Sequence, residues 1–220
     1  METRSCPDCP ASRIGVLGEM LPHGQHACAF RVATVSERAT IPHAWFGRYG
    51  LGLVRRGILV RQRVDGSGHA TAVDVVGPGG ALLLDAASEG DASGYAAAEA
   101  MVCLCPSERL EESCGSLPTA RDMMRLQQIA IERMDRLADA RNRPTASARL
   151  AALLAALGDV LAPPRKLDVI PPQLQRRDLA ALLALRHESV SRALAQLERT
   201  GAIKRTRDGI ELRDREALRA

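Results

Sequence analysis

Glu188, Ser191 and Arg192 place a carboxylate, a hydroxyl and a guanidinium at helical spacing near the end of this 220-residue chain. Residues at i, i+3 and i+4 share one face of a helix. Arginine can donate to guanine O6 and N7, and glutamate can accept from cytosine N4. A carboxylate is otherwise unfavourable beside DNA phosphates, so the pairing with Arg192 favours base reading. The simpler interpretation is an intrahelical ion pair between Glu188 and Arg192, contributing about 0.3–0.5 kcal/mol.

The neighbouring sequence predicts the elements that would position this stripe. Residues 174–198 read as two short helices with a tight turn near residues 185–187. In the second helix, Val190, Leu194 and Leu197 recur at i, i+4 and i+7, which gives an apolar stripe opposite the polar one. Two helices joined in this way are typical of a helix-turn-helix, whose second helix enters the DNA major groove.

The residues after these two helices predict a β-hairpin. Residues 202–207 and 210–213 are short β-type runs that flank Asp208-Gly209. Asp-Gly between two such runs favours a tight hairpin turn. A helix-turn-helix followed by a hairpin is a winged helix.

The C-terminal part of the chain is also the basic part. Residues 145–220 contain fourteen Lys and Arg against nine Asp and Glu, a net charge of +5, so the remainder of this +4 chain sums to −1. A basic segment on a nearly neutral body suggests a polyanionic partner, although a solvated surface could carry the same charge. We expect Ser189 to join the stripe at a DNA interface, with phosphate contacts from Arg176, Arg177, Arg186, Lys204, Arg205 and Arg207.

The six cysteines offer a second kind of chemistry. The sequence has no apolar run of membrane length and no signal-peptide pattern, so we expect a cytoplasmic protein. Disulfide scaffolds are rare in that compartment. We therefore expect the thiols to bind a metal or cluster, to act in redox chemistry, or to be buried structural groups.

The N-terminal arm contains the first group of candidate ligands. Cys6 and Cys9 form a C-x-x-C pair. Together with His23 and His26 they approximate the spacing of a zinc site, and Cys28 is adjacent. Such a site would be structural.

A second group of thiols lies in the middle of the chain. Cys103 and Cys105, at i and i+2, share one face of a predicted strand, and Cys114 follows closely in the sequence. These three residues could serve as a thiol switch or as a sensor of a soft metal or metalloid. Buried structural thiols are the simpler interpretation, which we favour for Cys105 and Cys114.

The first half of the chain predicts a β-domain followed by a long helix. Residues 30–106 read as short strands broken by turns, which is typical of a small barrel or sandwich. A helix of about 23 residues, roughly 35 Å long, follows from Thr119, a candidate N-cap. Residues 142–144 then predict a hinge, and residues 147–161 a further helix.

The long helix carries a narrow apolar stripe with spacings of three and four residues. A narrow stripe on a helix with charged ends predicts a two-helix dimer seam. The alternative is a helix that packs on its own domain. The stripe comprises Met123, Leu126, Ala130, Met134 and Leu137.

This order of elements resembles the CRP/FNR family of bacterial transcription regulators. The run His187-Glu188-Ser189-Val190-Ser191-Arg192 is similar to the Glu-x-x-Ser-Arg recognition pattern of the FNR branch. Residues 100–103 with Pro106, followed by residues 123–126, are similar to the FNR stretch in which a cluster-ligating cysteine precedes the dimer helix.

The resemblance implies an α+β fold with three parts. These are an N-terminal β-barrel (jelly roll) like that of cyclic-nucleotide-binding domains, a long dimerisation helix and a C-terminal winged helix-turn-helix. The expected boundaries are residues 1–29 for the cysteine-containing arm, 30–117 for the sensor barrel, 118–141 for the dimerisation helix and 142–220 for the DNA-binding domain.

The resemblance also implies a function. We expect a homodimeric, sequence-specific DNA-binding regulator that recognises pseudo-palindromic sites with TTGAT half-sites and works with RNA polymerase. Cys103 matches the distal ligand of an FNR-type iron–sulfur cluster, which implies a 4Fe-4S cluster held by Cys6, Cys9, Cys28 and Cys103. Cys9 and Cys28 are farther apart than in FNR, so Cys105 and Cys114 stay as alternatives for the fourth ligand.

Two other functions are disfavoured by the sequence. Residues 79–94, which match the phosphate cassette of cyclic-nucleotide-binding members, contain no arginine, and Glu89 and Asp91 would repel a phosphate. A cupin-like metal-dependent enzyme would need histidines grouped with a carboxylate. His43, His69 and His187 stand alone in the sequence, and no P-loop, nucleophile elbow or dinucleotide fingerprint is present. We therefore expect no enzymatic activity; a non-DNA-binding scaffold is the remaining alternative.

Overall fold

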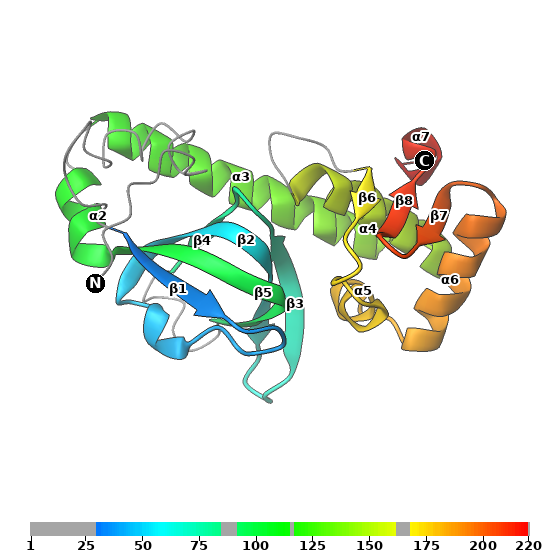
Figure 1. Ribbon diagram of the computed structural model, residues 1–220, viewed down its shortest axis with the longest axis horizontal. Helices are drawn as coiled ribbons and strands as arrows, with labels where there is room; N and C mark the ends of the chain where they lie inside the picture. Colours follow the sequence, from blue (N-terminus) through cyan, green and yellow to red (C-terminus); the bar gives the residue numbers. More distant parts are fainter. Residues whose placement is uncertain (1–29, 85–91, 115–116, 162–167, 220) are drawn as a thin grey trace.

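A computed structural model describes residues 30–84, 92–114, 117–161 and 168–219 (Figure 1). The first part is an antiparallel sheet with the strand order β1-β5-β2-β3, and β4 pairs with β2. A short 3-10 helix, η2 (His43–Trp45), follows the first strand. The strands are β1 (Arg31–Val35), β2 (Tyr49–Val64), β3 (Ala70–Val76), β4 (Ala81–Leu83) and β5 (Ala92–Pro106).

The predicted jelly-roll architecture is confirmed, but the sheet is not a closed barrel. Over the described strands the hydrogen-bonded path ends at β1 and at β3. The long strands β2 and β5 bend where their register shifts, on both sides of Arg56. Gly57 lies at this bend with φ +87°, and a Cβ there would meet the Glu99 carbonyl oxygen at 2.1 Å. Only glycine allows this close approach of two backbones.

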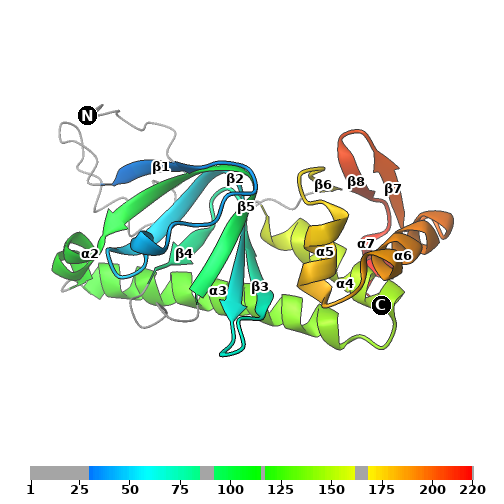
Figure 2. The ribbon, with the colours of Figure 1, turned by 90° about the horizontal axis from the view of Figure 1, so that it is seen from below.

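The long helix α3 (Leu117–Asn142) follows the sheet, with the unpredicted short helix α2 (Ser107–Cys114) between them. Figure 2 shows α3 running under the sheet and on towards the C-terminal elements. Leu126, Ala130 and Leu137 of the expected dimer seam are buried within the chain itself. The dimer-seam prediction is therefore wrong for these three residues, because the β-domain requires an apolar cover and they provide it.

The C-terminal part confirms the predicted winged helix-turn-helix. The helices of this part are α4 (Ala146–Val160), α5 (Arg176–Leu183), α6 (His187–Arg199) and α7 (Arg215–Arg219). The hairpin strands β7 (Ile203–Thr206) and β8 (Gly209–Leu212) form the wing, and β6 (Val169–Ile170) pairs with β8 as a third strand. The expected strand over residues 166–170 lies partly outside the described residues.

Gly209 is required by β6 rather than by the hairpin turn. The two turn residues are Arg207 and Asp208, and Gly209 already belongs to β8. Its φ is +132°, and a Cβ would lie 2.0 Å from the carbonyl oxygen of Ile170. The glycine therefore allows β6 to approach the wing closely.

One hydrophobic core joins the β-domain to the winged helix. Sheet residues such as Val60 and Ala72 pack in the same cluster as Leu154 of α4, Leu182 of α5 and Val190 of α6. A continuous core fixes the relative position of the elements that contribute to it. The orientation of the winged helix in this structure is therefore set partly by the sheet.

Candidate nucleic-acid interface

The turn between α5 and α6 sets the direction of the second helix. Ala184 follows α5 in the left-handed conformation, with φ 50° and ψ 44°, and its N–H bonds to carbonyls of the last turn of α5. The Leu185 N–H then donates to the Ala180 carbonyl at 3.0 Å. This pair of bonds closes the helix and turns the chain sharply. The tight turn expected near residues 185–187 is confirmed, one residue early.

The two faces of α6 are divided as the sequence predicts. Val190, Leu194 and Leu197 are buried, together with Ala193. Glu188 and Arg192 are exposed on the other side, and Ser191 is half-buried. No side-chain hydrogen bond or ion pair joins Glu188 or Arg192 to another described residue, so the alternative interpretation, an intrahelical ion pair, does not hold in this structure. Both charged groups are thus available to a ligand.

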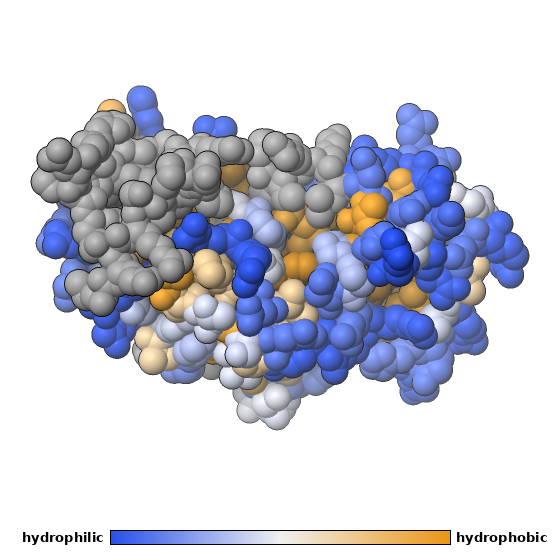
Figure 3. All heavy atoms as spheres, viewed as in Figure 1, coloured by the Kyte–Doolittle hydropathy of each residue, from blue (hydrophilic) through white to orange (hydrophobic). Residues whose placement is uncertain are grey.

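The predicted phosphate-binding cations surround this face. Arg176 and Arg177 are exposed in the first turn of α5, and Arg186 is exposed at the N-cap of α6. Lys204 and Arg207 are exposed on the wing. Figure 3 shows the surface over the C-terminal elements, on the right, as largely hydrophilic.

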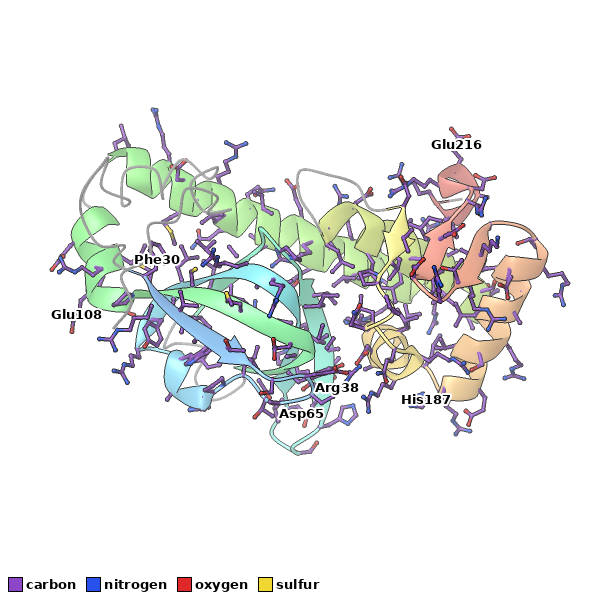
Figure 4. The ribbon with its side chains drawn as sticks, viewed as in Figure 1. Phe30, Arg38, Asp65, Glu108, His187 and Glu216 are labelled. Atoms are coloured by element: carbon purple, nitrogen blue, oxygen red, sulfur yellow. The ribbon has the colours of Figure 1, made fainter. Side chains whose placement is uncertain are left out.

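A groove of about 540 Å³ lies between α5, α6 and the wing. Arg176, Arg177, His187 and Arg205 line it, and Figure 4 labels His187 at the start of α6. A second hollow of about 380 Å³ lies beside Arg192. It is lined by the predicted Ser189 and by residues that sequence reasoning missed, among them Thr145, Ser147 and Gln196.

Thr145 belongs to this second hollow because it caps α4. Its side chain accepts a hydrogen bond from the Ala148 N–H at 3.1 Å. A threonine at the N-cap is a known signal for the start of a helix, because its hydroxyl accepts from a first-turn N–H that has no partner within the helix. Pro144 directly precedes Thr145 in the sequence. This signal could have located the start of α4 in the sequence.

Arg205 differs from the other predicted phosphate contacts. Its Nε donates to Glu198 Oε2 at 2.8 Å, and its backbone N–H donates to Glu198 Oε1 at 3.0 Å. The hydrogen bonds from Arg205 hold the pKa of the Glu198 carboxyl below its ordinary value. This pair anchors the wing to α6, a role that no local sequence pattern indicates because the partners lie on different elements.

Of the thiols, the structure describes the Cys103 and Cys105 side chains. Both are buried on β5 in a cluster with Leu51, Leu110 and Leu126, which confirms that they share a strand face. The Cys105 thiol lies 3.7 Å from the Pro106 carbonyl oxygen. Within the described ranges no group of three or more His, Cys, Asp and Glu could hold a metal ion. Outside the description lie Cys6, Cys9, His23, His26, Cys28 and the Cys114 side chain.

The path of β1 leads from the arm towards Cys103. Val32 lies opposite Cys103 in the β1–β5 ladder, and Phe30 packs in the same cluster as this cysteine. Cys28 precedes Phe30 by two residues.

Residues 148–220 match the protein family described as "Crp-like helix-turn-helix domain". FixK2 from Bradyrhizobium japonicum has a similar structure, with a TM-score of 0.70 at 22% identity over 86% of this chain and 95% of that one. A CooA mutant from Carboxydothermus hydrogenoformans gives a TM-score of 0.67 at 15% identity, over 93% and 94%. A CRP/FNR family regulator from Thermus thermophilus gives 0.54 at 22%, over 86% and 96%. No curated protein is recognisably similar in sequence.

The matched domain and the shared fold point the same way. The C-terminal third of the chain carries a Crp-like helix-turn-helix domain, and the chain has the fold of solved structures of CRP/FNR family regulators. The fold extends over the sensor-like sheet as well as the winged helix. Among the described helices, none has the length and apolar character that crossing a membrane demands.

Proposed function

We propose that this protein is a DNA-binding transcription regulator of the CRP/FNR type and that it reads specific base pairs with Glu188, Ser191 and Arg192, in the manner of the FNR branch. The observation that carries the proposal is the exposure of Glu188 and Arg192 on one face of a helix whose other face is fully anchored. A guanidinium and a carboxylate at this spacing can contact the two bases of a G·C pair. The expected TTGAT half-site contains one such pair; the half-site and an RNA polymerase contact rest on the resemblance.

The cations around α6 would hold the phosphate backbone. We assign this role to the exposed cations of α5, α6 and the wing, which are Arg176, Arg177, Arg186, Lys204 and Arg207. Arg205 acts differently, because its guanidinium is engaged by Glu198 and positions the wing. Ser189 lines the hollow next to Arg192 and would lie at the edge of the interface.

We propose that α3 forms the homodimer through a stripe different from the one expected from the sequence alone. Leu117, Met124 and Ile131 recur every seven residues, and all three are exposed, Met124 by 68% and Ile131 by 48%. An exposed heptad of apolar residues on a long helix favours pairing with a second helix. Two paired α3 helices would place two α6 helices on a pseudo-palindromic site.

Fluorescence anisotropy with labelled duplexes tests the DNA-binding proposal. The protein should bind a pseudo-palindrome with two TTGAT half-sites about 10³-fold or more tightly than a scrambled duplex of the same composition, at one stated salt concentration. Systematic selection from a random duplex pool should recover a two-fold symmetric site. Equal affinity for all duplexes would contradict sequence-specific binding.

For the sensor we propose a 4Fe-4S cluster held by Cys6, Cys9, Cys28 and Cys103. Support comes from Cys103, which lies opposite Val32 of β1 and packs in the same cluster as Phe30, the second residue after Cys28 in the sequence. Thiolates are the usual ligands of such a cluster, which would supply a redox- or gas-dependent change of ligation. Zinc bound by the arm, or thiol or metalloid chemistry at Cys103, Cys105 and Cys114, are the competing proposals.

Anaerobic purification distinguishes these proposals. The cluster predicts a brown protein with iron and sulfide near four per chain and loss of colour in Cys103→Ser. Stoichiometric zinc without iron would favour the zinc site. A colourless, metal-free protein after attempted reconstitution would exclude both metal proposals and leave the thiol chemistry.

A further inference from the structure

Asp178 is a buried carboxylate at the junction of the two domains. It is the third residue of α5, the first helix of the helix-turn-helix, and only 1% of it is exposed. Its Oδ2 accepts a hydrogen bond from the Gln175 N–H at 2.8 Å, as part of a capping box. A buried carboxylate is stable only when its oxygens are fully bonded.

The remaining bonds to Asp178 come from the β-domain. Arg38 donates from Nη1 to Oδ1 at 2.7 Å and from Nη2 to Oδ2 at 3.1 Å, and Tyr95 donates from its hydroxyl to Oδ1 at 2.7 Å. Arg38 also donates to the Gln173 carbonyl oxygen at 3.1 Å. Figure 4 shows Arg38 at the edge of the sheet domain that faces α5. Charge-assisted, two-pronged bonds of this kind fix geometry as well as contribute energy.

The other end of α5 is also tied to the rest of the chain. Arg141, in the last turn of α3, donates from Nε to the Leu182 carbonyl oxygen at 2.6 Å. The same guanidinium donates to the carbonyl oxygen of Ala72 on β3. The first helix of the DNA-binding motif is thus held at its N-terminus by Arg38 and Tyr95, and near its C-terminus by Arg141.

The bonds that hold α5 against the β-domain leave the proposed DNA-reading face of α6, with Glu188 and Arg192, uncovered. Glu188 and Arg192 are exposed while Asp178 is fully bonded to the β-domain. The docked arrangement therefore does not block the face by contact. Its effect must act through the orientation of α6, which a dimer needs in order to reach two half-sites at once.

The clamp also contains features that limit its strength. Arg38 has a φ of 66°, a left-handed conformation that is unfavourable for a residue with a Cβ. Its Nε is buried without a hydrogen-bond acceptor among the described residues, and Glu37 Oε1 lies 3.8 Å away. These two features reduce the net free energy that the clamp contributes, and opening it must also separate the apolar core shared by the sheet and the winged helix.

We propose that Arg38, Tyr95 and Asp178 form an interdomain clamp that holds the winged helix in its DNA-binding orientation, with residues 143–145 as the hinge; this rests on the proposed function. Arg38 and Tyr95 are positioning residues that touch no DNA. Opening of the clamp would lower the fraction of dimers with both α6 helices correctly placed, and the apparent affinity falls in proportion to that fraction.

The test compares Arg38→Ala and Tyr95→Phe with the wild-type protein; Asp178 is left intact because it also caps α5. Amide hydrogen exchange should become faster in β3 and α5 of both variants, without loss of α6 protection. Affinity for a two-half-site duplex should fall about fivefold or more, while affinity for a duplex with a single half-site stays unchanged. Arg38→Lys should recover part of the loss because it keeps one charged donor.

Arg56→Ala is the matched control, since it removes an exposed ion pair of the same type, with Glu99, inside the β-domain. Unchanged amide hydrogen exchange in β3 and α5 of both Tyr95→Phe and Arg38→Ala would contradict the existence of the clamp. Faster exchange with unchanged or tighter binding to the two-half-site duplex would overturn its role in DNA binding. If the wild-type protein bound no DNA, the proposed function would fail, and the exchange measurement would still decide whether the clamp exists.

Discussion

Arg133 of α3 and Asp74 of β3 form a fully buried, two-pronged ion pair. The guanidinium donates from Nε to Oδ1 at 2.6 Å and from Nη2 to Oδ2 at 2.7 Å. Nη2 also reaches the Ala81 carbonyl oxygen at 3.3 Å. The pair links the long helix to the sheet.

Removal of one partner of this pair should destabilise the protein strongly. Arg133→Met removes both hydrogen bonds to the buried Asp74 carboxylate and leaves only Arg61, whose Nη1 lies 3.8 Å from Oδ2, as a nearby cation. We expect the free energy of unfolding to fall by about 3–5 kcal/mol. The double variant Arg133→Met, Asp74→Leu should recover most of this loss. Urea denaturation at one fixed protein concentration measures both values. Additive losses in the double variant would contradict this account of the pair.

The seam prediction is tested by placing a charge on each side of α3. Ile131→Glu adds a carboxylate to the exposed heptad stripe and should convert the dimer to a monomer in analytical ultracentrifugation. Ile129→Glu is the matched control, since Ile129 is also exposed, by 41%, but lies off the stripe. A dimer that survives Ile131→Glu, or that is lost equally in both variants, would argue against the seam.

The ion pair between Arg205 of the wing and Glu198 of α6 predicts that the stability of the fold depends on pH. The pKa of Glu198 is lowered by Arg205, so the ion pair contributes stability above the ordinary carboxyl pKa and loses it as the pH falls through the lowered value. Glu198→Gln should therefore reduce the urea midpoint more at pH 7 than at pH 3. Arg205 is exposed and Glu198 is only half-buried, so we expect a small shift. An equal shift at the two pH values would rule out the ion pair as its cause.

Ala184 offers a substitution that should stabilise the fold. It adopts φ 50° between α5 and α6, where a Cβ is unfavourable and glycine is not. After allowance for the greater freedom of glycine in the unfolded chain, Ala184→Gly should raise the stability by about 0.5–1 kcal/mol. Thermal denaturation should show a higher midpoint with unchanged DNA affinity. A lower midpoint would mean that the left-handed turn is not strained.

The parts of this structure that the sequence predicts are those with strong local patterns. The α6 stripe, the Asp208-Gly209 hairpin and the long helix are each specified by spacing or turn residues within a short window. The two faces of α3 could not be separated in that way. Leu126 and Met124 are both apolar, and only the position of the sheet decides that the first is buried and the second exposed.

Contacts between distant segments could not be predicted from the sequence for the same reason. Arg38 and Asp178 are 140 residues apart, and neither lies in a sequence motif that would predict contact with the other. Glu198 and Arg205 are only seven residues apart, but their contact depends on how the wing folds back on α6. The polar stripe of α6 depends on no such distant partner, which is why Glu188, Ser191 and Arg192 could be proposed from the sequence alone.

The central claim is that α6 reads bases. It is tested most directly by a double-mutant cycle of binding free energies that combines Arg192→Ala with replacement of the G·C pair of the half-site. Arg192→Ala should cost about 1–3 kcal/mol of binding free energy on the intact site. The same variant should discriminate far less than wild type against a duplex in which that G·C pair is replaced by A·T. If Arg192→Ala weakened binding to both duplexes equally, Arg192 would be a phosphate contact and base reading by this face would be contradicted.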